Sequence, residues 1–261
     1  MPHNGLYKKG GTRRDFLLGG LCLPLLGGAC PVWAQQSGAP HWMPLSRAVL
    51  DYEMDGYWNR PVSGEGRIDW KYDRASSLYE LDLTISAMMM TFLYASRGTV
   101  DPAQGLIPVS YREKRIGRDR TVMIDHAARE VRFSWKPREV KAMPDGIQDV
   151  TSVVMQMTFL MANDLQKAQV GHRFKFPVAR MGEVKFWDFE VMGHPVVETR
   201  LGRYTTWQVR RIPPDNVVDN DVKVEFWLAP ELFYLPLKML FNKKDEVQLW
   251  VSLQKIRQVA A

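Results

Sequence analysis

The chain of 261 residues carries 35 lysine and arginine residues against 29 aspartate and glutamate residues, a formal net charge of +6. Because four basic residues and one acidic residue lie in the first 34 positions, the remainder is only weakly basic, which gives no argument for nucleic-acid binding but permits contact with anionic lipids or glycans. Hydrophobic residues make up 46% of the sequence, enough for a substantial core.

Residues 1–34 have the layout of a secretory signal peptide, with a basic start, an apolar run and small residues ending at Ala34. The segment TRRDFL, from Thr12, resembles the twin-arginine export signal, although an ordinary signal remains an alternative. We expect cleavage after Ala34, which removes Cys22 and Cys30, and a location in the periplasm or cell envelope. The apolar run is too short and glycine-rich to predict a transmembrane span. A second alternative is a lipoprotein anchored through Cys30, since GGAC resembles a lipobox.

After a linker at residues 35–46, alternation of polar and apolar residues predicts one β-rich domain over residues 47–258. Short turns favour hairpins and an antiparallel sheet. Pro236 within a predicted strand indicates an edge or a bulge. The expected strands are 47–58, 66–73, 77–87, 106–116, 119–124, 130–135, 172–178, 183–192, 203–211, 222–228, 234–241 and 247–253.

One segment has helical rather than alternating periodicity. Residues 149–165 place valine, methionine and leucine three and four positions apart, and Asp149 is suited to cap the start of a helix. The fold class expected is therefore mainly β: a single curved antiparallel sheet or open half-barrel, with one prominent amphipathic helix packed on its concave side.

Several segments together resemble DUF3108, a bacterial family of exported proteins of unknown function, over roughly residues 47–256. They are LIPVSYREKR, RTVMIDHAAREVRFSW, DGIQDVTSVVMQMTFL, FEVMGHPVVETRLGRYTTWQVRR and EFWLAPELFYLPLKML. The resemblance brings no catalytic residues. The last of these segments, a strand ending in Trp227-Leu228-Ala229-Pro230 followed by Leu235-Pro236-Leu237-Lys238, also looks like part of the LolA and LolB periplasmic lipoprotein carriers. This resemblance implies an open half-barrel that binds an acyl chain or another amphiphile.

Methionine-rich segments are candidates for the wall of an apolar site, because methionine is flexible and polarisable. The alternative is that these side chains fill the core. The candidate ligand-binding residues are Met155, Met157, Phe159, Met161, Met88, Met90, Phe226 and Trp135.

A basic stretch from Tyr111 to Arg120 offers a seat for a phosphate or carboxylate headgroup, with Arg112 and Lys114 as candidates. The alternative is a solvated hairpin. Alternation places Arg112 and Lys114 on one face of the strand, and Glu113 and Arg115 on the other.

No motif for a metal, a nucleotide or a catalytic nucleophile is found, so we expect no cofactor and no metal site. The expected function is an exported binding module that holds a lipid or a lipoprotein segment between sheet and helix. The alternatives are an enzyme acting on cell-wall or lipid material, with Asp125 and His126 as candidates, and an assembly factor that contacts only proteins.

Overall fold

The computed structural model describes residues 46–180, 182–214, 223–243 and 246–258, all within one compact unit, Ala39–Ala261. The predicted signal peptide and nearly all of the predicted linker lie outside the described residues, and the proposed domain boundaries stay predictions.

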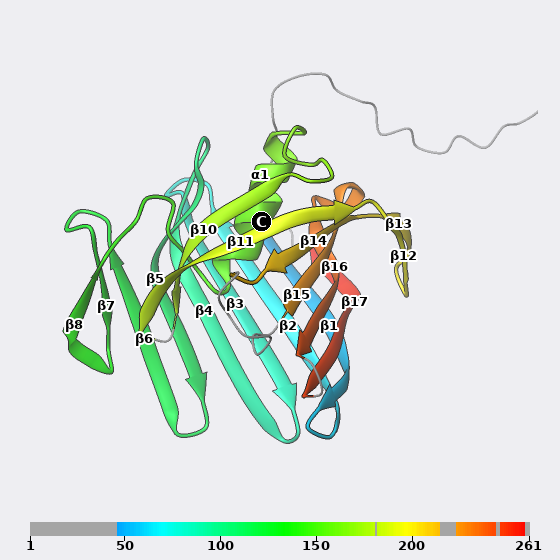
Figure 1. The fold of residues 1–261 in the computed structure, drawn as a ribbon, viewed down its shortest axis with the longest axis horizontal. Coiled ribbons are helices and arrows are strands. Elements are labelled where there is room, and N and C mark those ends of the chain that lie inside the picture. Colours follow the sequence, from blue (N-terminus) through cyan, green and yellow to red (C-terminus); the bar gives the residue numbers. More distant parts are fainter. Residues whose placement is uncertain (1–45, 181, 215–222, 244–245, 259–261) are drawn as a thin grey trace, which may run out of the picture. The chain divides into compact units, whose positions relative to one another are not determined.

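The described residues form β-strands, one α-helix and one short 3₁₀ helix (Figure 1). In chain order they are β1 (Arg47–Trp58), β2 (Pro61–Asp73), β3 (Leu78–Ala87), β4 (Met90–Asp101), β5 (Gly105–Arg115), β6 (Arg118–Asp125), β7 (Glu130–Phe133), β8 (Lys136–Ala142), β9 (Gln148–Asp149), α1 (Ser152–Asn163), β10 (Arg173–Arg180), β11 (Glu183–Gly193), β12 (Val196–Thr199), β13 (Gly202–Thr205), β14 (Trp207–Ile212), β15 (Lys223–Ala229), η1 (Pro230–Leu232), β16 (Leu235–Lys243) and β17 (Val247–Gln258).

One large sheet contains all of these strands except the β12–β13 hairpin. Its order is β8-β7-β6-β5-β4-β3-β2-β1-β17-β16-β15-β14-β11-β10-β9. The first and last strands, β1 and β17, pair in the middle, and a meander extends from each of them toward an edge. All described pairs are antiparallel except β9–β10. The edge strands β8 and β9 are not paired with each other, so the curved sheet stays open, as the sequence predicts.

The helix α1 packs on the concave face of the sheet, where it contacts β5, β9 and β10. Figure 1 shows the β10–β11 ribbon crossing in front of it. Because this ribbon covers the side that an open sheet would leave to solvent, α1 is buried around most of its circumference. The prediction of one helix on the concave side is confirmed, and the helix covers residues 152–163 within the expected 149–165.

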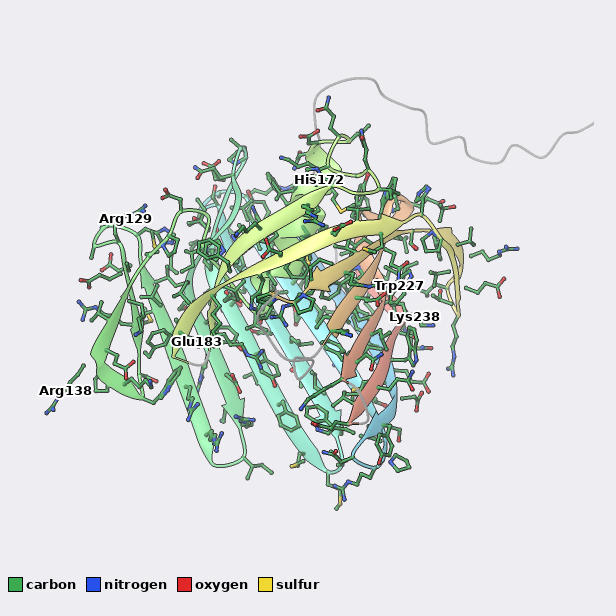
Figure 2. The ribbon with its side chains drawn as sticks, viewed as in Figure 1. Arg129, Arg138, His172, Glu183, Trp227 and Lys238 are labelled. Carbon is green, nitrogen blue, oxygen red and sulfur yellow. The ribbon has the colours of Figure 1, made fainter. Side chains whose placement is uncertain are left out.

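The convex face carries a smaller apolar cluster under the β12–β13 hairpin. Val197 of this hairpin packs with Trp227 and Leu240, and the rings of Trp227 and Trp250 lie 5.7 Å apart. Figure 2 shows Trp227 beside Lys238, its register partner on β16.

Four strands were not predicted from the sequence: β4, β8 and the short strands β9 and β12. β4 was missed because its first half is an apolar run without alternation. β8 was missed because it is an almost fully exposed, charged edge strand, and Figure 2 shows Arg138 pointing away from the molecule there. Pro236 was expected to mark either an edge strand or a bulge. It lies in the interior strand β16, opposite Leu228, and the register with β15 shifts between Trp227 and Leu228, so it marks a bulge.

The sheet has two ends that differ in what covers them. In an antiparallel meander, alternate turns lie at the same end. The turns β1–β2, β3–β4, β5–β6 and β7–β8 lie at one end, here called the hairpin end, at the bottom of Figure 1. The turns β2–β3, β4–β5 and β6–β7 lie at the other, here called the helix end, where the side chain of Gln156 in α1 donates a hydrogen bond to the carbonyl of Gln104.

Gly98 allows β4 and β5 to approach closely at a bulge. A Cβ at this position would lie 2.1 Å from the carbonyl oxygen of Ile107 and 2.7 Å from the Cα of Pro108. We expect Gly98→Ala to lower the free energy of unfolding by about 1–3 kcal/mol, measured by urea unfolding. The control is Gly66→Ala, whose Cβ would meet only the Tyr52 Cβ at 3.5 Å. Equal stability of the two variants would contradict the close approach.

Candidate functional site

The concave face is buried at the helix end, and it is less covered in the middle of β2, β3 and β4. On β3, Tyr79 and Leu81 are each 1% exposed, whereas Leu83 and Ile85, further along the same face, are only half-buried. On β4, Ser96 is 0% exposed and Phe92 is half-buried. The cover is therefore incomplete partway along these strands, whereas Val62 and Ala87, still nearer the hairpin end, are buried.

The half-buried apolar residues form a continuous patch, here called the uncovered strip. In the strand register Leu83 lies between Ile68 and Tyr94, and Ile85 lies opposite Phe92. Neighbours in register have Cβ atoms about 5 Å apart, so these side chains touch across three strands. The strip consists of Ile68, Leu83, Ile85, Phe92 and Tyr94.

A charged cluster borders the uncovered strip. Glu113 is the register partner of Tyr94, is 8% exposed, and has its Oε1 3.6 Å from the Nε of Arg115. Burial raises the pKa of Tyr94 above its usual range and the charge of Glu113 adds to this, while Arg115 and Arg180 oppose it. Arg180, at the end of β10, also opposes the burial that raises the pKa of Tyr111. Two guanidinium groups and one carboxylate thus converge on the polar side of the strip.

A buried hydrogen-bond network anchors the start of α1 to the sheet. Asp149 is 0% exposed, and its Oδ2 accepts a hydrogen bond of 2.5 Å from the Ser96 hydroxyl, which lies 2.8 Å from the Tyr79 hydroxyl. Its Oδ1 accepts hydrogen bonds from the backbone N–H groups of Thr151 and Ser152. The observed N-cap residue is Thr151, two positions after the predicted cap Asp149. Asp149 nevertheless stabilises the start of the helix through these hydrogen bonds. Burial raises the pKa of Asp149.

Further buried side chains hold α1 against strand ends. Gln156 accepts a hydrogen bond from the backbone N–H of Leu106 at 2.7 Å, and Gln148 donates one to the carbonyl of the same residue at 2.9 Å. On the other side, the Thr158 hydroxyl donates to the carbonyl of Tyr234. Breaking these hydrogen bonds would leave buried polar groups without partners, which is unfavourable, so α1 is held in one position.

The predicted ligand residues of the helix belong to the core. Met157 and Met161 are 0% exposed, and Met155, Phe159 and Phe226 are each 5% exposed or less. A side chain without accessible surface adjoins no space large enough for a water molecule. Contact of these residues with a ligand would require side chains or the helix to move, and it stays a prediction.

The other predicted apolar residues lie nearer the hairpin end. Met88 is half-buried in the β3–β4 turn, where its sulfur accepts a hydrogen bond of 3.1 Å from Arg60, and Met90 is half-buried at the start of β4. Trp135 lies in the β7–β8 turn, with the guanidinium carbon of Arg120 4.8 Å from its ring centroid. Binding by these residues also stays a prediction.

The predicted headgroup residues lie on the opposite face of β5 from Tyr111 and Glu113. Arg112 and Lys114 are both exposed, and the Nε of Arg112 donates a hydrogen bond of 2.8 Å to Asp119. A headgroup held by them would bind to the convex face, which stays a prediction. Arg115 was recognised as lying on the other face, but Arg180 was missed because only the tertiary fold brings the end of β10 near Tyr94 and Tyr111.

Asp125 and His126, the candidate residues of the enzyme hypothesis, form hydrogen bonds with the backbone around the β6–β7 turn. Asp125 accepts a hydrogen bond from the backbone N–H of Ala128, and Nε2 of His126 lies 2.8 Å from the carbonyl oxygen of Pro108. In the described part of the chain, no three His, Cys, Asp or Glu residues are grouped to hold a metal. Within those same residues, no helix has the length and apolar character needed to cross a membrane.

Comparison with protein families gives one assignment. The model of DUF3108, described as a protein of unknown function, matches residues 51–252. The chain belongs to the DUF3108 family. No curated protein matches it.

Solved structures extend the comparison to the fold of this DUF3108 member. The crystal structure of a beta-barrel-like DUF1849 protein from Brucella abortus is similar with a TM-score of 0.58 and 11% identity, covering 83% of this chain and 99% of that one. A DUF1329 protein from Desulfovibrio piger has a TM-score of 0.28 and 9% identity, covering 83% of this chain and 87% of that one. A putative outer membrane lipoprotein-sorting protein domain from Vibrio parahaemolyticus has a TM-score of 0.24 and 10% identity, covering 82% and 86%. Only the first supports an argument, and that argument concerns the fold alone.

Asp149 should make stability depend on pH in a defined direction. Burial raises the pKa of Asp149 in the folded state above its ordinary value of 3.8. The contribution of Asp149 to the free energy of unfolding is therefore greatest below pH 3.8, and it declines as pH rises toward the raised pKa. We expect Asp149→Asn to gain stability relative to the natural protein as pH rises from about 4 to 7.

Urea unfolding at several pH values measures this difference. Asp73→Asn is the control of opposite sign, because hydrogen bonds from Ser76 and Ala75 lower the pKa of Asp73. The stability contributed by Asp73 is present above the ordinary pKa and is lost as pH falls. The free energy of unfolding of Asp149→Asn relative to the natural protein should change with pH in the direction opposite to that of Asp73→Asn. A difference that is constant with pH, or that changes in the same direction as for Asp73→Asn, would contradict the raised pKa of Asp149.

Proposed function

We propose that this DUF3108 protein is an envelope binding module for an amphiphile with an anionic head. The observation that carries the proposal is the uncovered strip, a continuous half-exposed apolar patch bordered by Arg115 and Arg180. The location in the envelope rests on the export signal predicted in residues 1–34. The protein would hold a lipid, or the lipid-modified segment of a lipoprotein, rather than transform it.

The apolar part of the ligand would lie on the uncovered strip. Apolar surface that is removed from water contributes roughly 25 cal/mol per Å², so covering five half-exposed side chains favours binding of an acyl chain. Ligand sites of this kind are mostly apolar with a few polar groups that set orientation. The strip and its charged border have this composition.

The anionic head would lie beside Arg115 and Arg180. Guanidinium groups bind carboxylates and phosphates through paired hydrogen bonds. Glu113, already 3.6 Å from Arg115, offsets one of the two positive charges and leaves the cluster positive. A carboxylate or a phosphate head is therefore favoured over a cationic one.

The space between α1 and the sheet is a less favourable position for the same ligand. Met157 and Met161 fill it without leaving accessible surface, and Gln156 and Thr158 hold the helix in place by buried hydrogen bonds. An acyl chain can reach this region only by displacing these side chains. Binding on the strip needs no such displacement.

Phe92→Ser tests the apolar contact. Loss of a phenyl ring from the strip should weaken binding of a fluorescent fatty acid about tenfold, since about 1.4 kcal/mol of contact energy is removed. Leu93→Ser is the matched control, because Leu93 is the next residue on the same strand and faces the convex side. The proposal fails if the natural protein binds no fatty acid, or if both variants bind like it.

Arginine variants distinguish the two positions for the head. We expect Arg115→Gln and Arg180→Gln each to weaken binding of the fluorescent fatty acid by about fivefold to tenfold, the effect of losing one charge-assisted hydrogen bond. Arg112→Gln, on the convex face, should leave the dissociation constant unchanged. The reverse result would place the head at Arg112 and Lys114, and would reject the site on the concave face.

A further inference from the structure

The two ends of the sheet have turns of opposite chemistry. At the helix end, each of three turns contains an aspartate whose Oδ1 accepts backbone N–H groups of the same turn. Asp73 accepts from Ala75, Asp101 from Ala103 and Gln104, and Asp125 from Ala128. These aspartates serve the local structure, since Asp in this position stabilises the turn itself.

The turns at the hairpin end present several large apolar side chains to solvent, whereas the three turns of the helix end are flanked by one, Leu78, which is 52% exposed. Trp58 in the β1–β2 turn is 53% exposed, Met89 in the β3–β4 turn is 105% exposed, and Ile116 in the β5–β6 turn is 74% exposed. Tyr57, next to Trp58, is 43% exposed. The first two turns touch each other, because Arg60 donates hydrogen bonds to the sulfur of Met88. Exposed apolar groups gathered at one place mark an interaction surface.

The backbone of the β3–β4 turn does not favour the residues that occupy it. Ala87 pairs with Met90, so Met88 and Met89 alone make the turn, with φ angles of 52° and 62°. A two-residue turn with both φ angles positive favours Asn-Gly, because the Cβ of other residues is crowded in this conformation. Two methionines therefore strain the turn; Met88 packs partly against the core, but Met89, which is fully exposed, gains no packing in return.

Positive charge surrounds these apolar residues. Over residues 57–61, 86–91 and 114–119, which form the three turns, four residues are basic and one is acidic. The acidic residue, Asp119, is paired with Arg112. The basic residues are Arg60, Lys114, Arg115 and Arg118. In contrast, the three Asp-containing turns of the helix end at residues 73–77, 101–104 and 125–129 hold three acidic and two basic residues.

We propose that the hairpin end docks on the surface of an anionic lipid bilayer. Tryptophan and tyrosine favour the boundary between lipid tails and water, and arginine and lysine beside them attract anionic headgroups. Methionine and isoleucine at the tips can enter the lipid because each stands on a narrow turn and is largely exposed. A protein surface would need shape complementarity over a broad area, whereas three separate tips on one line suit a planar bilayer.

Docking at this end also faces the open part of the concave side. The uncovered strip lies toward the hairpin end, so an amphiphile leaving a docked bilayer would meet it directly. The docking inference is independent of the proposed function, because the tips, their charges and the strained turn exist whether or not a ligand binds the strip.

Co-sedimentation with vesicles tests the docking. The full chain should bind vesicles of equal phosphatidylcholine and phosphatidylglycerol more tightly than vesicles of phosphatidylcholine alone, and added salt should weaken the binding. Trp58→Ser should lower the partition coefficient at least fivefold. The variant Met89→Gly should lower it similarly while raising the temperature of unfolding, because glycine suits the positive φ angle of 62° at this position.

The control variant is Leu165→Ser with Phe233→Ser, two exposed apolar residues away from the hairpin end, and it should bind within twofold of the natural protein. All variants carry residues 1–34, so any membrane affinity of that segment is common to them. The inference is overturned if the natural protein does not bind the mixed vesicles, or if hairpin-end and control variants bind alike. It is also overturned if hairpin-end variants keep vesicle binding but lose capture of a protein from envelope extracts.

Binding of fluorescent fatty acid without vesicles is measured on the same variants. Loss of vesicle binding with fatty-acid binding retained assigns the two activities to separate surfaces. If the natural protein binds no fatty acid but binds vesicles through the hairpin end, the proposed function fails and the docking inference stands.

Discussion

Buried hydrogen bonds between α1 and one end of the sheet determine how the rest of the molecule is arranged. Asp149, Gln156 and Thr158 each place a polar group where water cannot reach it, and each finds its partner on a strand or turn at the helix end. A buried polar group without a partner is unfavourable by about 1–3 kcal/mol, so these contacts allow only one position of the helix. The concave face is consequently closed at that end, and the uncovered strip further along β2, β3 and β4 remains half-exposed.

This asymmetry gives the two faces and two ends of one sheet different chemistry. The concave face is apolar, with Glu113, Arg115 and Arg180 at its border, whereas alternate residues of the same strands on the convex face form ion pairs such as that of Arg112 with Asp119. The ends differ as well, because aspartates complete the turns at the helix end while large apolar side chains occupy those at the hairpin end. An amphiphile and a bilayer surface are partners that match such a distribution, since both join apolar and charged parts.

The pairing of β1 with β17 makes this arrangement possible in one sheet. Both meanders start from that central pair, so segments far apart in the chain, β5 and β10, come to lie on either side of α1. The β10–β11 ribbon thereby covers the helix and brings Arg180 near Tyr94 and Tyr111. The DUF1849 structure has a similar fold at 11% identity, so this architecture tolerates wide sequence divergence.

The sequence by itself determined the strands with clear alternation, a helix within residues 149–165 and an edge or a bulge at Pro236, because periodicity and proline geometry act over a few residues. It also separated Arg112 from Arg115 by alternation. Only the tertiary structure decided that Met157 and Met161 are core, since their burial depends on a ribbon more than ten residues away in the chain. For the same reason, the partnership of Ser96 with Asp149 and the approach of Arg180 to β5 were beyond any local pattern: each joins groups that meet only when the sheet curves around the helix.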